Sequence, residues 1–318
     1  MTGTSPPSDV LLSGFAFAGD PLDRADHLRD DAAALAAMWP QARILVLDQE
    51  GQAYADADGS LQAPSGAELG GGPGAAIFLG LKQDVAWFAV AGDALAYTAP
   101  QRVGLRRAAA AWPAFESGAF ALARALLHWQ SRTRYCGICA GAIEFRRAGY
   151  LGHCSGCGAD QYPRVDPAVI VAVSDGQRLL LGRQPGWPAR RYSVVAGFVE
   201  PGETLEQTVA REVLEETRVR VRSSRYLAAQ PWPFPGALML GFTAQAEPDP
   251  PQVDGVELED ARWFSAEEIG AALRRDQHDD GQGILLSPAI SIARSLIEHW
   301  YAGAVGSRGA ESPAQTSP

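Results

Sequence analysis

The chain has 318 residues, a formal net charge of −10 and a hydrophobic content of 47%. This length suggests about two domains, and the acidic balance argues against tight, sequence-independent binding of duplex nucleic acid. The sequence shows neither an apolar run of about 18 residues nor a basic and then apolar leader, so we expect a cytoplasmic protein with no membrane partner.

Residues 1–131 are expected to form a small α+β domain that carries no recognisable chemistry. The first ten residues are rich in Ser and Pro, a composition typical of disorder. Near the end of the domain, Ser117 can cap a helix whose apolar stripe of Phe120, Ala123 and Leu127 would pack on the domain. The earlier elements expected are a helix over 22–39 and strands over 42–47, 75–81 and 85–91.

All four cysteines of the chain lie in the next segment. They form two CxxC pairs separated by fourteen residues, a spacing typical of a tetrahedral structural Zn²⁺ site. Two redox dithiols are the alternative, but a redox motif usually begins a helix in a βαβ unit, and this segment is short and Gly-rich. Four thiolates leave no open coordination position, so the zinc should be structural. We therefore expect a zinc ribbon over 132–161, with one Zn²⁺ held by Cys136, Cys139, Cys154 and Cys157.

After the ribbon, three strands lead into a glycine-rich loop and a helix. Thr204 and Gln207 have the spacing of a capping box, and the dozen residues that follow contain neither Gly nor Pro. We therefore expect a helix from about Leu205 to Thr217, which begins at the end of the third strand. The three strands are expected over 168–173, 178–183 and 192–196.

Three glutamates of this helix, Glu212, Glu215 and Glu216, stand at i, i+3 and i+4 and share one face. Their mutual repulsion would not stabilise a solvated helix, whereas a site for hard divalent cations needs several converging carboxylate oxygens. The glycine-rich loop could bring the backbone of Ala196 or Gly197 close to such an ion. An ordinary acidic helix is the alternative.

A proline-aromatic segment, residues 230–235 with the sequence QPWPFP, follows the helix. Its alternating prolines would give a stiff, polyproline-like conformation that fixes its two aromatic rings. Such a segment can be a structural corner, or it can present rings on which a planar base stacks, and composition does not decide between them. The elements expected after it are a strand over 238–246, a helix opened by Ser265 and a closing helix over 289–301.

The stretch from Gly197 to Val219 resembles the Nudix box, G-x5-E-x7-R-E-U-x-E-E-x-G-U, where U is aliphatic. Within it, Glu203 can pair with Arg211 and so fix the loop against the helix. One position departs, because Arg218 stands where the motif has Gly. That Gly follows the helix, where a left-handed residue is common, so Arg would cost on the order of 1 kcal/mol if the conformation is kept. The matching residues are Gly197, Glu203, Arg211, Glu212, Val213, Glu215, Glu216 and Val219.

The chain resembles more specifically the NADH pyrophosphatase branch of the Nudix hydrolases, also described as NAD-capped RNA hydrolases. That branch joins an N-terminal domain, a four-cysteine zinc ribbon and a Nudix domain, and it carries the signature SQPWPFPxS. Here residues 229–237 read AQPWPFPGA, with alanine in place of both serines. The resemblance implies an α/β (α+β) fold with a Nudix α/β/α sandwich. The expected parts are an N-terminal α+β domain over 1–131, the ribbon over 132–161, the Nudix domain over 162–302 and a disordered tail over 303–318.

The resemblance also implies an activity: a homodimer that uses Mg²⁺ or Mn²⁺ to cleave the pyrophosphate of NADH or NAD⁺ into NMN(H) and AMP, and that removes NAD caps from RNA. The catalytic glutamates would be Glu212, Glu215, Glu216 and Glu257, which would hold the ion with the Ala196 carbonyl. Sequence does not decide whether Glu215 or Glu257 is the general base. The residues implied to line the nucleotide pocket are Tyr162, Ala229, Gln230, Pro231, Trp232, Pro233, Phe234, Pro235, Gly236 and Ala293, with Arg106 a weaker candidate.

Three alternatives to this function remain. Within the same class, the chain could be a Nudix hydrolase of another nucleoside diphosphate derivative, such as ADP-ribose or a dinucleoside polyphosphate. A catalytically silent, nucleotide-sensing module would be expected to lose box glutamates, and all are present. A nucleic-acid-binding protein could use the arginines near the ribbon, but the acidity of the whole chain disfavours this role.

Overall fold

The computed structural model describes residues 12–253, 255–275, 279 and 281–309. The predicted disorder of residues 1–10 and of residues 310–318 falls outside this part of the chain. Two compact units are present, one comprising Met1–Phe15, Asp166–Gln230 and Leu238–Pro318, the other Ala16–Val165 and Pro231–Ala237. This division differs from the expected one in two respects. The ribbon belongs to the same unit as the N-terminal domain, and residues 231–235 of the proline-aromatic segment also belong to that unit rather than to the Nudix unit.

The N-terminal unit is built on a sheet that, within the described residues, has five strands in the order β3-β4-β1-β2-β5. Strands β1 and β4 are parallel, and the other neighbours are antiparallel. Among the residues described, this sheet includes no strand of the ribbon or of the Nudix unit. The strands are β1 (Arg43–Leu47), β2 (Ala53–Ala55), β3 (Ile77–Lys82), β4 (Val85–Ala91) and β5 (Gln101–Val103).

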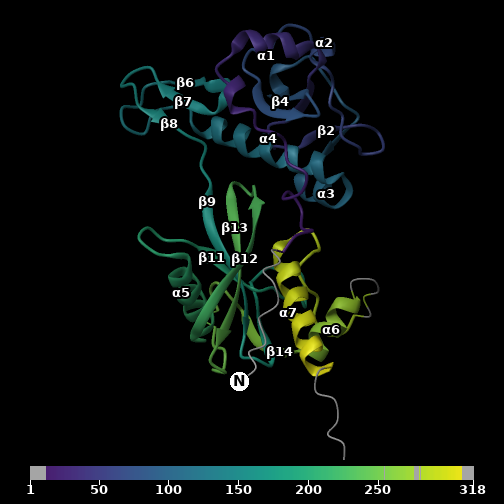
Figure 1. Cartoon of the computed structure of the whole chain (residues 1–318), viewed down its shortest axis with the longest axis vertical. Coiled ribbons are helices and arrows are strands. Elements are labelled where there is room, and N and C mark those ends of the chain that lie inside the picture. Colours follow the sequence, from purple (N-terminus) through teal and green to yellow (C-terminus); the bar gives the residue numbers. More distant parts are fainter. Residues whose placement is uncertain (1–11, 254, 276–278, 280, 310–318) are drawn as a thin grey trace, which may run out of the picture. The chain divides into compact units, whose positions relative to one another are not determined.

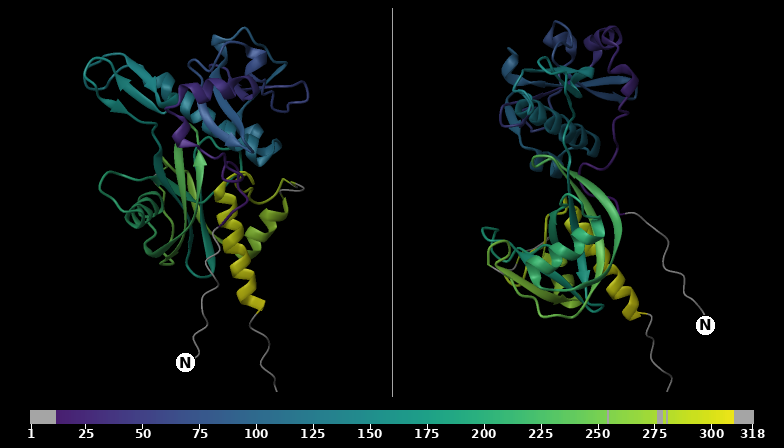
Figure 2. Two further views of the ribbon diagram at one scale, coloured as in Figure 1. Left: turned by 45° about the horizontal axis from the view of Figure 1, so that its top comes forward. Right: turned by 90° about the vertical axis from the view of Figure 1, so that its left-hand side faces the viewer.

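Both faces of this sheet are buried, as the alternation along β1 shows. Leu45 and Leu47 belong to one core cluster, which includes Phe120 of α4 (Ala114–Arg132), whereas Ile44 and Val46 belong to the opposite cluster. Figures 1 and 2 show α4 lying along the sheet. On the opposite face lie α1 (Ala32–Met38) and the 3-10 turn Trp39–Gln41. The remaining helices of the unit are α2 (Gly66–Leu69), α3 (Leu105–Ala111) and the 3-10 turns Asp26–Leu28, Gly92–Ala94 and Arg147–Gly149.

The first helix is shorter than predicted. The sequence indicated 22–39, but the α-helix occupies only Ala32–Met38. The side chain of Asp31 accepts a hydrogen bond from the Ala34 backbone N–H at 2.9 Å, so the cap lies inside the predicted range. Before it, Ala25 takes a left-handed conformation with φ of 40°, which a continuous helix does not allow.

The Nudix unit contains, in the part of the chain that is described, a six-stranded sheet in the order β12-β13-β9-β10-β14, with β11 added beside β9. Three helices accompany it: α5 (Leu205–Thr217), α6 (Ala266–Arg275) and α7 (Ile292–Gly309). The predicted helix over 205–217 is therefore confirmed. The strands are β9 (Asp166–Ser174), β10 (Arg178–Arg183), β11 (Val195–Phe198), β12 (Val221–Trp232), β13 (Ala237–Ala246) and β14 (Asp260–Ser265).

The two faces of this sheet carry different helices, and β9 again shows why. Val169, Val171 and Val173 pack in the cluster that includes Val209 and Val213 of α5, whereas Ile170 and Ala172 pack with residues of α6 and α7. A run of apolar residues with no polar alternation is expected for a strand covered on both sides. Figure 1 shows α5 on one side of the sheet and α6 and α7 on the other. The predicted α/β/α sandwich is confirmed.

The closing helix α7 was predicted over 289–301 but runs over Ile292–Gly309, so residues 303–309 are helical and the expected tail is wrong there. Its start is fixed by Gln230, a fully buried side chain whose amide oxygen accepts from the Ile292 N–H at 2.8 Å and whose amide nitrogen donates to the Ile290 carbonyl at 2.8 Å. Among the described residues, no helix is long and apolar enough to cross a membrane.

Candidate active site and metal centre

The loop between β11 and α5 depends on a close approach that only glycine allows. A Cβ built on Gly197 would lie 1.9 Å from Cδ of Glu212, far inside any real contact distance. The backbone of β11 and the Glu212 carboxylate therefore lie directly against each other. Ala196, beside it, pairs with Ile170 in the β11–β9 ladder and is half-buried.

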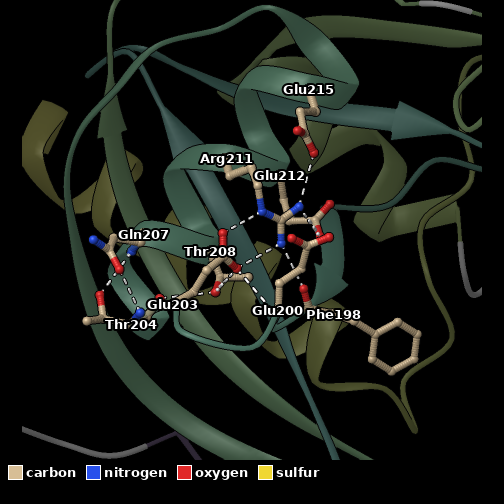
Figure 3. Close-up of polar contacts among 9 residues, drawn as sticks. All are labelled: Phe198, Glu200, Glu203, Thr204, Gln207, Thr208, Arg211, Glu212 and Glu215. Carbon is tan, nitrogen blue, oxygen red and sulfur yellow. Dashed lines mark hydrogen bonds and ion pairs between the residues drawn. The ribbon is translucent and has the colours of Figure 1, made fainter.

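Arg211 is the hub that ties the loop to the helix (Figure 3). Its guanidinium donates to both carboxylate oxygens of Glu203, at 2.6 and 3.0 Å, and to the Phe198 carbonyl at 2.9 Å. This bidentate pair holds the pKa of Glu203 down to about 2, chiefly through the hydrogen bonds from Arg211. The predicted brace between Glu203 and Arg211 is therefore present in the structure.

The start of α5 carries the predicted capping box. The Thr204 hydroxyl accepts from the Gln207 N–H at 3.3 Å, and the Gln207 side chain accepts from the Thr204 N–H at 2.8 Å. Thr208 was not singled out by sequence, yet its hydroxyl contacts Glu203 at 2.9 Å and so supports the same brace. The sequence feature that could have indicated this role is a threonine one turn after the N-cap, on the side of the helix that faces Glu203.

The three helix glutamates differ in exposure. Glu212 and Glu216 are buried, at 8% and 7% exposed, whereas the Glu215 side chain is 57% exposed. Burial raises the pKa of Glu212, and the negative charges of Glu215 and Glu257 raise it further, against the lowering effect of Arg211. Three carboxylates that repel one another, one of them buried, suit a hard divalent cation, whose charge would relieve both burial and repulsion.

The carboxylate oxygens are not gathered around one point in this structure. Arg211 Nη1 lies 2.9 Å from Glu212 and 3.0 Å from Glu215, so it divides the cluster. Glu257 is exposed on the loop before β14. In the part of the chain that is described, only the four cysteines bring their ligand atoms together at metal-binding distances. The donor set fits Mg²⁺ or Mn²⁺, while its assignment as the ion site stays a prediction.

Phe198 is a second residue that sequence reasoning missed. Its ring is 60% exposed at the end of β11 and points away from Arg211 (Figure 3). Exposure of a large aromatic ring costs hydrophobic free energy, which a ligand that stacks on it would recover. An aromatic residue directly after the first glycine of the box was the signal for it.

Arg218, where the motif has Gly, does keep the left-handed conformation, with φ of 60° and ψ of 13° at the end of α5. We therefore expect Arg218→Gly to stabilise the protein by about 1 kcal/mol, because glycine adopts this conformation without steric cost. Urea unfolding should show a higher midpoint for Arg218→Gly than for Arg218→Ala, which keeps the same penalty. Equal midpoints for the two variants would contradict this explanation.

The four cysteines form two knuckles of the same design. In each, the N–H after the second cysteine donates to the carbonyl of the first: Ala140 to Cys136 at 2.9 Å and Gly158 to Cys154 at 3.0 Å. Ala140 and Gly158 are both left-handed, with φ of 58° and 76°. The ribbon strands that carry the knuckles are β6 (Ile143–Arg146), β7 (Leu151–Cys154) and β8 (Asp160–Gln161).

The sulfur atoms of the four cysteines have the separations of a tetrahedral metal site. All lie within 4.8 Å of one another, and two pairs are 3.7 and 3.4 Å apart, close to the edge of about 3.8 Å that Zn–S bonds of about 2.3 Å give. Backbone N–H groups also point at the sulfurs, and the one from Cys157 is the main cause that lowers the pKa of Cys154 to about 6. The residues fit Zn²⁺ as thiolates.

Substitution of one knuckle cysteine tests this fit. We expect Cys154→Ser to lower the zinc content of the purified protein from about one ion per chain to near zero, because a structural site needs its complete set of thiolates. Elemental analysis by mass spectrometry would measure the content, and Ser155→Ala is the matched control. If Cys154→Ser retained zinc at the wild-type level, the four cysteines would not be the zinc ligands.

The residues implied to line a nucleotide pocket fall into two groups. Gln230 and Ala293 are buried in the Nudix unit, at 0% and 2% exposed, so their side chains have structural roles there. Ala229 is half-buried on β12. Tyr162 is 65% exposed in the N-terminal unit, which also contains Gly236 and residues 231–235 of the proline-aromatic segment.

The proline-aromatic segment is not polyproline-like. Residues 230–232 complete β12, and a tight turn leads to β13 at Ala237. Trp232 and Phe234 are half-buried, with ring centroids 5.0 Å apart, and both pack against Phe17 at 6.3 and 6.4 Å. The guanidinium of Arg106 stands 4.1 Å from the Phe234 ring centroid. The segment is therefore a structural corner of the N-terminal unit whose rings keep part of their surface exposed.

Comparisons with known proteins agree with this geometry. The NUDIX domain family matches residues 164–285. NAD-capped RNA hydrolase NudC of Mycobacterium bovis (strain BCG / Pasteur 1173P2) is 39% identical over 290 residues, which cover 88% of this chain and 92% of that protein. The chain belongs to the Nudix hydrolase family. Within it, the match over nearly the whole length places the chain in the branch of the NAD-capped RNA hydrolases.

Two further similarities complete the comparison of this Nudix hydrolase. Human NAD-capped RNA hydrolase NUDT12 is 42% identical over 195 residues, which cover 58% of this chain and 42% of that protein. A crystal structure of a Nudix hydrolase from Nitrosomonas europaea is 22% identical and covers 57% of this chain and 96% of that one, with a TM-score of 0.42.

Proposed function

We propose that this Nudix hydrolase cleaves the pyrophosphate bond of NADH or NAD⁺ to give NMN(H) and AMP, and that it also removes NAD caps from RNA 5′ ends. The observation that carries the proposal is the braced carboxylate cluster of α5, in which Glu212 lies against β11 at Gly197 and Arg211 pairs with Glu203. Support for the substrate comes from the NAD-capped RNA hydrolases that resemble the chain over most of its length.

The carboxylates would hold the catalytic ion. Among the residues that would bind it, Glu212 and Glu216 are buried and Ala196, which would offer its carbonyl, is half-buried, while Glu215 and Glu257 are exposed. When bound, Mg²⁺ or Mn²⁺ supplies charge neutralisation for the pyrophosphate and an acidified water. Glu215 or Glu257 would accept the proton of that water, since both carboxylates are exposed enough to reach it.

Binding of the ion would require Arg211 to release Glu212 and Glu215. Its bonds to Glu203 and Phe198 hold the guanidinium in place without help from the helix glutamates. A divalent cation would therefore replace only the contacts to Glu212 and Glu215, and the brace would survive. The loop that presents Ala196 and Gly197 then stays fixed while the substrate binds.

The half-buried Trp232 and Phe234 and the exposed Tyr162 would stack on the bases of the dinucleotide, and Arg106 would contribute a positive charge. We further propose a homodimer in the cytoplasm with one structural Zn²⁺ in each ribbon. The ribbon would keep its loop-rich segment rigid without taking part in the chemistry.

The proposal is tested by hydrolysis of NADH, NAD⁺, ADP-ribose and an NAD-capped RNA with Mg²⁺ or Mn²⁺, with the products separated by chromatography. We expect NMNH and AMP from NADH, and a 5′-monophosphate RNA from the capped RNA. A higher kcat/KM for ADP-ribose than for NADH would instead favour the second candidate, a hydrolase of another nucleoside diphosphate derivative. The observation that favours this candidate is the replacement of both signature serines by Ala229 and Ala237.

A further inference from the structure

Arg124, on α4 of the N-terminal unit, contacts the proline-aromatic segment at two points. Its Nη1 donates a hydrogen bond to the Pro233 carbonyl, and its guanidinium carbon lies 5.3 Å from the centroid of the Phe234 ring. Both contacts lie far from Arg124 in sequence and within one compact unit. The residue thus holds the backbone and a ring of the same turn.

The surroundings of Arg124 show that these contacts are its main partners. No ion pair of Arg124 occurs among the described residues, although the side chain is half-buried and stands near the like charge of Arg106. Burial and that charge both lower the pKa of the guanidinium, so retention of the charge there has a free-energy cost. Gly51 leaves room for it, because a Cβ at that position would lie 3.0 Å from Nε.

The contacts of Arg124 with Pro233 and Phe234 also restrain the neighbouring Trp232. Pro233 is buried, and the Phe234 N–H donates to the Trp232 carbonyl at 2.7 Å, so the three residues form one tight unit. The Trp232 and Phe234 rings contact each other with planes 59° apart. A guanidinium that fixes the Pro233 carbonyl and the Phe234 ring therefore also fixes the orientation of Trp232.

We infer that Arg124 is a positioning residue for substrate recognition: it holds Trp232 and Phe234 in the orientation in which they stack on a base of the dinucleotide. The inference rests on the proposed function, which assigns these rings to base stacking. Arg124 would act only through these rings and not on a reacting atom. If the role of Arg124 were purely structural, its substitution would instead destabilise the N-terminal unit and lower the activity on all substrates equally.

The first test observes the rings without any substrate. Protein labelled with 5-fluorotryptophan gives a ¹⁹F resonance for Trp232, which Trp232→Phe assigns by its loss. We expect Arg124→Met to shift or broaden this resonance, while Arg107→Met, an exposed arginine of α3 in the same unit, leaves it unchanged. An unchanged Trp232 resonance in a folded Arg124→Met protein would overturn the inference, whatever substrate the enzyme hydrolyses.

The second test separates positioning from folding by kinetics. We expect Arg124→Met to raise KM for NADH about tenfold with kcat within about twofold, since loss of ring orientation weakens stacking and leaves the carboxylate site intact. Arg124→Lys, which keeps a donor, should recover part of the loss. In a Trp232→Ala background, the Arg124→Met change should have a smaller further effect, because one of the two rings that it orients is gone.

These outcomes distinguish the inference from the proposed function. If wild-type protein fails to hydrolyse NADH but the ¹⁹F result is as expected, the substrate assignment fails and the positioning role of Arg124 stands for the substrate that is hydrolysed. If NADH is cleaved but Arg124→Met lowers kcat equally for NADH and ADP-ribose, or adds its full effect to Trp232→Ala, the proposed function stands and the positioning role is wrong.

Discussion

Gly197→Ala should lower kcat for pyrophosphate hydrolysis by at least about a hundredfold, although it adds a single methyl group. That methyl would lie 1.9 Å from Cδ of Glu212, so the carboxylate or the β11 backbone must move. A displacement of about 1 Å at a catalytic group costs about this much rate. The control is Gly72→Ala, where the added methyl has open space around it.

A double-mutant cycle identifies the cause of that loss. If the methyl group acts through Glu212, Gly197→Ala should cost little further activity in a Glu212→Ala background, where the clash is absent. A full additional loss would show that the backbone of the loop, rather than the carboxylate, is disturbed. Near wild-type kcat in the single Gly197→Ala variant would contradict the close approach itself.

Glu216→Gln is expected to abolish hydrolysis almost completely, by about a thousandfold or more, because a neutral amide removes one charged ligand from the ion. Loss of several kcal/mol of charge stabilisation in the transition state corresponds to this factor. The substitution keeps the volume of a buried side chain, so the thermal unfolding midpoint should change little. Steady-state kinetics and thermal unfolding would be measured on the same preparation.

Glu206→Gln is the matched control, since Glu206 is an exposed acidic residue in the first turn of the same helix. It should retain wild-type kcat. If Glu216→Gln kept more than about a tenth of wild-type activity, Glu216 would not be a required ligand, and the buried carboxylate would need a structural explanation such as a role in packing of α5.

Sequence predicted best what local interactions determine. The bounds of α5 followed from Thr204 and Gln207, because a capping box uses only groups within one turn. The left-handed conformation at Arg218 lies where the Nudix box has its glycine. The strand over 168–173 followed from its unbroken apolar run, and the spacing of the four cysteines alone indicated their clustering.

What sequence missed depends on contacts between distant segments. The proline-aromatic segment falls within the Nudix domain expected over 162–302, yet Phe17 and Arg124 contact it within the N-terminal unit. The burial of Gln230 and its role at the start of α7 also require knowledge of Ile290 and Ile292. The clash that makes Gly197 necessary involves a residue on the far side of the loop, which no local pattern reveals.

Cleavage of NADH in water enriched in ¹⁸O, followed by mass spectrometry of the products, tests the proposed chemistry most directly. We predict NMNH and AMP, with one ¹⁸O atom in the phosphate of one product, formed only with a divalent cation and not by Glu216→Gln. This result would show that water attacks phosphorus at the carboxylate site. Release of nicotinamide, or equal labelling and product formation by Glu216→Gln, would contradict it.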